Sequence, residues 1–240
     1  MKVVIIVLCY NESVLIEEMV RHYRERIPDC RIIMYDNESS DNSVEIAERL
    51  GCEVRVWSSG GKNDTDAKRK IHSTVWKEEE CDWVLCIDMD EWVCVTGEDL
   101  EEEEKKGTTI LKIKGYDMIG ESEREDLSDI DLHKIKRGIE NNWESKNLCF
   151  KKGEIEEINY SHGNHEINPK GVIKLSDKVY INKHMCKLGI PYFTKKNQSR
   201  YIRCSDQRKK GMSRHYKAEV RDIKERYMDL YRKSKPLEFI

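Results

Sequence analysis

The sequence predicts an α/β fold with a mostly parallel central sheet flanked by helices. Strand and helix patterns alternate over residues 1–95, and strands that are joined by helical crossovers pair in parallel. Residues 3–9 form a continuous apolar run rich in β-branched side chains, which is typical of a strand buried on both faces. Polar residues follow three of the predicted strands, at the edge where sheets of this kind bind ligands. We therefore expect a ligand site at one edge of the sheet.

Four strand patterns separated by helix patterns make up the first half of the chain. Ser13 has the residue type of an N-cap, and an apolar stripe of residues spaced by four, Leu15, Met19 and Tyr23, follows it. Residues 52–57 alternate apolar and charged side chains, as an edge strand does. In chain order we expect a strand at 3–9, a helix from Ser13, a strand at 31–35, a helix at 44–50 with Gly51 as its C′ residue, an edge strand at 52–57, a helix at 65–80 and a strand at 82–88.

The patterns after residue 96 are weaker. We interpret the acidic run 98–106 as a solvated helix face. The basic segment 195–211 is interpreted in the same way, in preference to a phosphate-facing flap or a membrane-binding patch. Residues 215–234 predict a charged helix with apolar residues along one side. Further strands are expected at 108–120, 147–152, 171–175 and 178–184.

Charge, hydropathy and cysteine content narrow the class of protein. The 43 basic and 46 acidic residues leave a formal charge of −3, so the overall charge gives no reason to expect nucleic acid as a partner. No stretch approaches the roughly 20 apolar residues of a membrane-spanning helix. The nine cysteines are scattered without a C-x-x-C pair, which favours free thiols in a reducing compartment. We expect a soluble, cytoplasmic protein without a transmembrane segment.

The segment CIDMDEW, residues 86–92, carries Asp88, Asp90 and Glu91 at the end of a predicted strand. In an extended chain, residues two apart point to the same side, so Asp88 and Asp90 can face one ion. Hard divalent cations prefer oxygen ligands, and Mg²⁺ combines one or two carboxylates with substrate phosphates. Two bare carboxylates repel each other, which favours a metal site over a solvated acidic loop. The same repulsion predicts that Asp90→Asn keeps its stability.

Three motifs together carry a specific resemblance. VVIIVLCYNES at the N-terminus, IIMYDNESSDNS after the second strand and CIDMDEW after the fourth resemble the nucleotide-binding half of GT-A fold glycosyltransferases, in particular small family-2-like enzymes with a D-x-D-E motif. Downstream, SKNLCFKKGEI, SHGNHEIN and YINKHMCKLG are similar to the second half of that group. The resemblance implies one GT-A catalytic domain over 1–212, with a nucleotide-binding half (1–95) and an acceptor half (96–212). A C-terminal helical extension (213–240) would follow.

The resemblance also implies a role for each motif. The nucleoside pocket would be lined by Cys9, Tyr10, Asn11 and Glu12, with Asp36 or Asn37 at the base or ribose, Lys68 or Arg69 at the uracil or the diphosphate, and Asp88 near the ribose and the metal. Asp90 would bind a Mn²⁺ or Mg²⁺ ion that bridges the diphosphate, and Glu91 would support it. His184 and His165 are candidates to complete the metal shell. In the second motif Asn37-Glu38 replaces the usual Asp-Gly, which leaves the base open.

The reaction implied is transfer of a hexosyl or deoxyhexosyl group from a nucleoside-diphosphate sugar, with UDP favoured, to a hydroxyl group of a glycan or another acceptor. Inversion is favoured, and it needs a base that deprotonates the acceptor hydroxyl. Glu144, Asp117 and Glu166 are candidate bases, and His165 is a further candidate for catalysis or acceptor contact. Trp143, beside Glu144, either stacks on a sugar ring or packs structurally.

Two alternative functions stay open at the level of sequence. A nucleotidyltransferase also combines a parallel sheet with acidic metal ligands, but CYNES stands where a glycine-rich basic phosphate loop would be expected after the first strand. The second alternative is a non-catalytic module that binds a nucleotide or a partner. Asp88 and Asp90 favour an enzyme over such a module.

Overall fold

The α/β class predicted from the sequence is confirmed by the computed structural model, which describes residues 1–124, 127–128, 130–209, 211–217 and 219–238. The first half alternates strands and helices: β1 (Val3–Cys9), α1 (Ser13–Arg26), β2 (Arg31–Asp36), α2 (Ser43–Arg49), β3 (Glu53–Val56), α3 (Thr65–Thr74) and β4 (Trp83–Asp88). The four strands predicted in this half are confirmed to within one residue at each end.

The second half contains most of the strands and, after α4, three further helices in the described part of the chain. Its elements are β5 (Glu91–Cys94), α4 (Gly97–Lys105), β6 (Ile110–Ile119), β7 (Arg137–Glu140), β8 (Cys149–Lys151), β9 (Ile155–Glu157), β10 (Lys170–Gly171), β11 (Leu175–Lys187), α5 (Ile190–Arg203), α6 (Ser205–Lys209), α7 (Val220–Lys233) and β12 (Lys235–Pro236). The strand expected at 171–175 is wrong. Gly171, with a φ of 116°, ends the short pairing of β10 with β9, and β11 begins only at Leu175.

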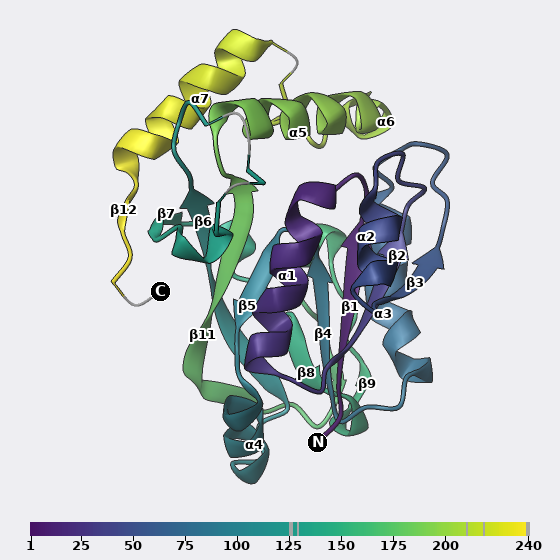
Figure 1. Cartoon of the computed structure of the whole chain (residues 1–240). Helices are drawn as coiled ribbons and strands as arrows, with labels where there is room; N and C mark the ends of the chain where they lie inside the picture. The colour runs from purple at the N-terminus through teal and green to yellow at the C-terminus, as the bar shows by residue number, and fades with distance from the viewer. Residues whose placement is uncertain (125–126, 129, 210, 218, 239–240) are drawn as a thin grey trace.

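Ten strands of the described chain form one sheet in the order β12-β7-β6-β8-β4-β1-β2-β3, with β11 paired to both β5 and β6. The part β3-β2-β1-β4 is parallel, whereas β8, β7 and β12 run antiparallel to their neighbours. Figure 1 shows α1 across one face of this sheet, α4 at its lower end, and α5 with α6 across its upper end. The sheet is therefore parallel in the N-terminal half and mixed as a whole.

The loop after β2 caps the helix that follows β1. α1 begins at Ser13, so Glu12 and not Ser13 is the N-cap residue. Asp41 Oδ2 accepts a hydrogen bond from the Ser13 N–H at 3.2 Å, and Ser43 Oγ accepts one from the Glu12 N–H at 2.9 Å. Because the first N–H groups of a helix have no partner within it, these contacts satisfy them from a neighbouring loop. They hold the ends of β1 and β2 together.

The main core lies between α1 and the sheet and contains Tyr23, Trp83 and Trp92 among its fully buried side chains. The Tyr23 hydroxyl donates to the Glu91 carbonyl at 3.0 Å and accepts from the Val93 N–H at 3.0 Å. A buried tyrosine normally keeps its hydroxyl hydrogen-bonded in this way. The contact fastens the chain segment after Asp90 to α1.

The C-terminal helix is part of the same body. Ile223 and Tyr227 of α7 are buried in an apolar cluster with Phe193 of α5, and β12 pairs with β7. The helix predicted at 215–234 is confirmed from Val220 onward. The boundary at residue 212 stays a prediction.

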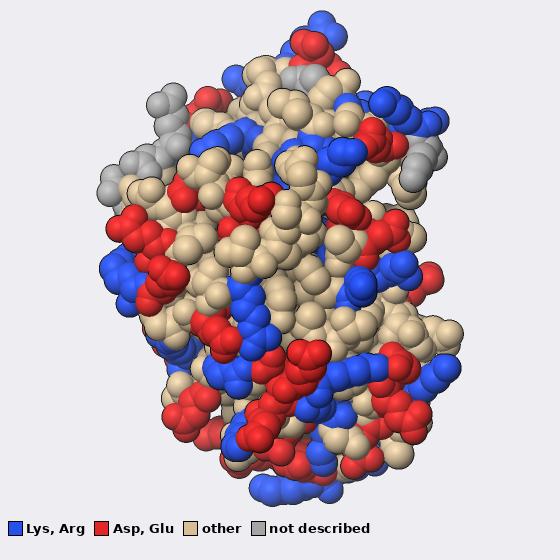
Figure 2. Space-filling model, turned by 90° about the vertical axis from the view of Figure 1, so that its right-hand side faces the viewer, with Lys and Arg blue, Asp and Glu red and all other residues tan. Residues whose placement is uncertain are grey.

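The surface is highly charged. Figure 2 shows the side of the molecule that lies to the right in Figure 1, where positive and negative side chains are interspersed. The formal charge of −3 reflects the near balance of 43 basic and 46 acidic residues. Among the described helices, none combines the length and apolar composition needed to cross a bilayer. All nine cysteines are free.

His72, a fully buried residue of α3, should make folding stability depend on pH. Burial lowers its pKa from 6.5 to about 4, so the unfolded chain binds a proton more readily than the native protein between these values. Stability is then present above pH 6.5 and is lost as the pH falls toward 4. We expect a loss of about 2 to 3 kcal/mol from this residue between pH 7 and pH 4.5, at about 1.4 kcal/mol per pH unit.

Urea unfolding at the two pH values measures this effect. His72→Gln should flatten the dependence, while His162→Gln, at an exposed position, should leave it as in the native chain. An unchanged slope in His72→Gln would contradict the prediction.

Candidate active site

A cavity of about 430 Å³ opens where β1, β2 and β4 end. Parallel strands bring their carboxyl ends to one edge of a sheet, and the predicted motifs meet there. The residues of these motifs that line the cavity are Cys9, Tyr10, Asn11, Glu12, Asn37, Lys68, Asp88 and Asp90. A cavity is therefore present at the predicted edge of the sheet.

Asp36 and Asn37, left as alternatives by the sequence, take different places. Asp36 is buried and accepts from the backbone N–H of Ser39 at 2.9 Å and from its hydroxyl at 2.5 Å, and it is not among the cavity-lining residues. Asn37 lines the cavity, and its Oδ1 accepts from the Ser59 N–H at 3.0 Å. Asp36 thus holds the loop after β2, and Asn37 is the one that faces the cavity.

Asp88 pairs with Lys68 of α3, at 2.9 Å between Oδ1 and Nζ. Burial alone would raise the pKa of Asp88, but Lys68 and Lys146 outweigh it and lower the pKa to about 2. Lys68 is therefore in the site as expected. The alternative, Arg69, pairs with Asp66 at 3.1 Å near the surface and does not line the cavity.

The prediction that the chain is extended from Asp88 to Asp90 is wrong, because β4 ends at Asp88 and a turn follows at Met89-Asp90. Both residues nevertheless line the cavity, where they pair with different cations. Asp90 Oδ2 lies 2.7 Å from Lys196 Nζ and 2.9 Å from Arg200 Nη2. Burial would raise the pKa of Asp90, but these two cations hold it well below its usual range.

The two cations come from α5, within the basic segment that was interpreted as a solvated helix face. That interpretation is wrong for Lys196 and Arg200, which are four residues apart and so lie on one side of the helix. Lys196 also contacts Glu12, at 2.8 Å from Oε1. The cavity is lined from α5 by Pro191, Tyr192, Lys195, Lys196, Ser199, Arg200 and Arg203. The spacing of the basic residues was the only available signal, and it does not say which side is buried.

His184 of β11 also lies near Asp90. Its Nε2 lies 3.5 Å from Asp90 Oδ2, and its Nδ1 lies 2.7 Å from Asp117 Oδ1. Asp117 is buried and also accepts from Lys187 at 2.7 Å and from Asn141 at 3.0 Å. Burial would lower the pKa of His184, but Glu144 and Asp117 outweigh it and raise the pKa well above 6.5.

His165, the alternative to His184, is held elsewhere. Its Nδ1 lies 2.6 Å from the Trp143 carbonyl oxygen, and its ring meets the Trp143 ring edge-on at 4.9 Å. Among the described residues, the group of potential metal ligands that includes Asp90 contains His184 and not His165. Trp143 is 70% exposed, so it does not pack in the core. His162 Nε2 lies 3.0 Å from Asp66 Oδ1, so its partner differs from those of His165 and His184.

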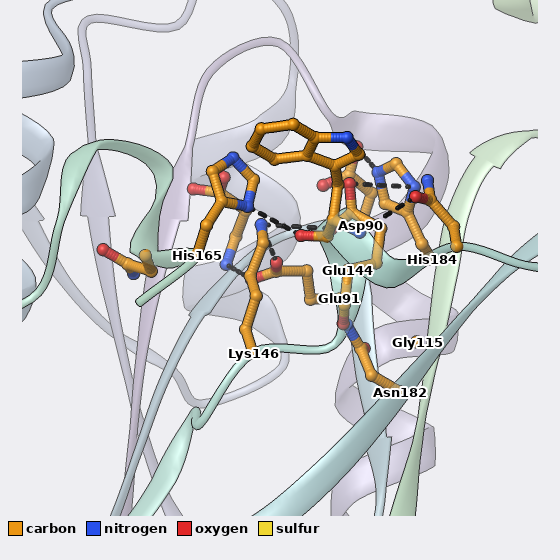
Figure 3. A network of polar contacts seen from close by, with 12 residues as sticks. Asp90, Glu91, Gly115, Glu144, Lys146, His165, Asn182 and His184 are labelled. Carbon is orange, nitrogen blue, oxygen red and sulfur yellow. Dashed lines mark hydrogen bonds and ion pairs between the residues drawn. The ribbon is translucent and has the colours of Figure 1, made fainter. Parts of the chain in front are cut away.

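Glu144 ends a short 3₁₀ turn (Asn142–Glu144) next to this cluster. Figure 3 places it between the Glu91–Lys146 pair and His184. Lys146 Nζ lies 2.6 Å from Glu91 Oε1 and 3.1 Å from Glu144 Oε2. Glu91 Oε2 accepts from the Asp88 N–H at 2.7 Å, so Glu91 supports the turn, as expected, and burial raises its pKa to about 7.

Comparison with known proteins finds a match for the N-terminal part of the chain. Residues 4–96 match the sequence model of glycosyl transferase family 2. Protein RfbJ of Shigella flexneri is 29% identical over 89 residues, a stretch that covers 37% of this chain and 64% of that protein. The match thus spans less than two thirds of the curated relative.

Solved structures are similar at lower levels. The TarS fragment 1–349 of S. aureus has 15% identity and a TM-score of 0.47 over 97% of this chain and 72% of its own. Glucosyl-3-phosphoglycerate synthase of Mycobacterium tuberculosis, in complex with Mn²⁺, UDP and glucosyl-3-phosphoglycerate, has 16% identity and a TM-score of 0.33 over 48% of this chain and 44% of its own.

The family match covers β1 to β5, the segment that supplies the strand ends of the cavity. With the central sheet and its flanking helices, it confirms the predicted GT-A fold class. Residues 4–96 of this chain are thus similar to glycosyl transferase family 2.

Proposed function

We propose that the protein transfers a hexosyl or deoxyhexosyl group from a nucleoside-diphosphate sugar, with UDP favoured, to a hydroxyl group of a glycan or another acceptor, with inversion. The observation that carries this proposal is the composition of the cavity. The cavity is lined both by polar residues at the strand ends and by cations of α5. A nucleoside diphosphate needs both kinds of surface, one for the nucleoside and one for its charge.

Lys196 and Arg200 are the proposed partners of the diphosphate. Both compensate the buried charge of Asp90, and phosphate oxygens are strong acceptors for such donors. Tyr10 and Asn37 would contact the nucleoside, since both line the cavity at the ends of β1 and β2. The Arg203 guanidinium, 3.3 Å from the Tyr10 ring centroid, would hold that ring in place.

Asp90 and His184 are the proposed metal ligands. The donor set fits a divalent ion: it contains a carboxylate and an imidazole whose other nitrogen is held by Asp117, the usual way in which a ligating histidine is oriented. Mn²⁺ or Mg²⁺ bound there would neutralise charge on the departing diphosphate. Asp88 would contribute to the ribose contact or the metal, and the proposal assigns His165 to the acceptor side.

Glu144 is the proposed base. Asp117 holds His184 and Lys187 and has no free role as a base, because three donors already occupy it. The Glu144 Oε1 atom lies 3.6 Å from His184 Nδ1. In the chain, Glu144 directly follows Trp143, whose side chain is exposed. An acceptor sugar stacked on Trp143 would then present its hydroxyl to this carboxylate.

The test is a panel of nucleotide sugars with Mn²⁺, monitored for release of the nucleoside diphosphate. Glu144→Gln should lower the rate by roughly 10²- to 10⁴-fold, the usual contribution of a general base, in a variant that melting curves show to be folded. Glu166→Gln, an exposed position near His165, is the matched control and should keep the rate.

Other outcomes favour the alternative functions. Release of pyrophosphate from a nucleoside triphosphate would indicate a nucleotidyltransferase. A nucleotide-dependent melting shift without turnover of any donor would indicate a binding module. The proposed setting is the cytoplasm, with one catalytic domain over 1–212, and the free thiols support it.

A further inference from the structure

Cys186 lies next to the proposed metal ligands. It follows His184 by two residues on β11, in a stretch where the pairing of β11 with β6 shifts register. The Cys186 sulfur, an Asp90 carboxylate oxygen and a His184 ring nitrogen all lie within 4.8 Å of one another. Between them, the Met185 N–H donates to the Asp90 carbonyl at 2.7 Å, which holds β11 against the Asp90 turn.

Cys186 belongs to the apolar cluster that joins β11, α5 and α7, but its sulfur also contacts a charged group. Cys149, by comparison, is fully buried within the main apolar cluster. Cys186 is 4% exposed, and its sulfur lies 3.6 Å from Arg200 Nη1, the guanidinium that also binds Asp90. The Cys186 sulfur therefore lies next to the ion pair of Arg200 and Asp90.

We propose that Cys186 is the third protein ligand of the metal, and that the site selects a borderline first-row ion such as Co²⁺ or Zn²⁺ over Mg²⁺. The proposal rests on the proposed function for Asp90 and His184. A shell of carboxylate, imidazole and thiolate suits borderline ions, whereas Mg²⁺ demands oxygen ligands. The three donor atoms, within 4.8 Å of one another, are near enough to converge on one ion with bonds of about 2.0 to 2.3 Å.

Lys196 and Arg200 set a condition on binding. Both cations occupy the Asp90 carboxylate, and a divalent ion beside them is repelled unless they find other partners. A nucleoside diphosphate supplies such partners in the same cavity. The metal should therefore bind much more tightly in the presence of UDP than alone.

The experiment is titration of the full chain with Co²⁺ in the presence of UDP. Bound Co²⁺ should produce a near-ultraviolet sulfur-to-cobalt charge-transfer band. Cys186→Ser should lose this band and bind Co²⁺ at least about tenfold more weakly. Cys94→Ser, a partly exposed cysteine of β5, is the matched control and should keep both. Cys186→Asp, with an oxygen ligand of similar size, should shift the ratio of Co²⁺ to Mg²⁺ affinity toward Mg²⁺.

Any of three results would overturn the proposal. The charge-transfer band persists in Cys186→Ser, Co²⁺ binds to the native chain without producing the band, or Co²⁺ does not bind in the presence of UDP. Melting curves establish that the variants are folded. If donor turnover persists while the band is absent, this inference fails and the proposed function stands. If turnover is absent from the native chain with every donor and ion, the proposed function fails.

Discussion

Asp90→Asn is expected to lower release of the nucleoside diphosphate by roughly a hundredfold or more, because it removes a charged metal ligand where the departing diphosphate gains charge. The same change should destabilise the protein by about 3 kcal/mol, since Arg200 loses its carboxylate partner and Lys196 keeps only Glu12. Donor turnover and urea unfolding measure the two effects separately.

The stability part of this result reverses what the sequence alone predicts. Two bare carboxylates would repel, and loss of one would relieve the fold. In the structure, Asp88 and Asp90 each pair with a cation. Loss of either carboxylate therefore removes an ion-pair partner from a cation and does not relieve a repulsion. The double variant D90N/K196M should regain part of the stability and none of the activity.

Asp66→Asn is the control for charge removal as such. Its carboxylate is 69% exposed and pairs with Arg69 at 3.1 Å, and exposed pairs contribute about 1 kcal/mol or less. If Asp90→Asn were as stable as the native chain, the ion pairs with α5 would not exist in solution. Full activity in Asp90→Asn would remove Asp90 from the proposed metal site.

Gly115→Ala is expected to disrupt the placement of Glu144. A Cβ atom at Gly115 would lie 2.2 Å from the Glu144 carbonyl carbon and 2.5 Å from its Cβ, so the 3₁₀ turn that carries Glu144 has to move. Asn141 and Asn182 hold this turn by hydrogen bonds to the Gly115 and Glu144 carbonyls at 2.9 and 3.2 Å. Figure 3 shows Gly115 and Asn182 below Glu144.

We expect Gly115→Ala to lose about 1 to 3 kcal/mol of stability, the usual cost of overpacking, and at least about tenfold in donor turnover when the acceptor is present. Displacement of a base by about 1 Å is enough for such a loss. Gly153→Ala is the matched control, because no atom lies within 4 Å of a Cβ built there. Unaltered turnover in Gly115→Ala would show that the position of Glu144 is not critical.

The sequence by itself determined the four strands of the first half and the edge of the sheet at which the site lies. Both depend on local information. Strand periodicity and apolar runs are read within a few residues, and parallel strands with helical crossovers necessarily end at one edge. Local patterns are therefore sufficient to place Tyr10, Asn37 and Asp88 at that edge.

The tertiary structure alone decided which charges meet. Lys196 lies 106 residues after Asp90 in the chain, and the pattern of a basic helix does not say which of its sides packs against a sheet. His184 lies near Asp90 because β11 pairs with β5, where His184 is opposite Glu91. The different partners of Asp88 and Asp90 follow from a turn that apolar periodicity does not predict. Such contacts depend on packing between distant elements, which no local pattern encodes.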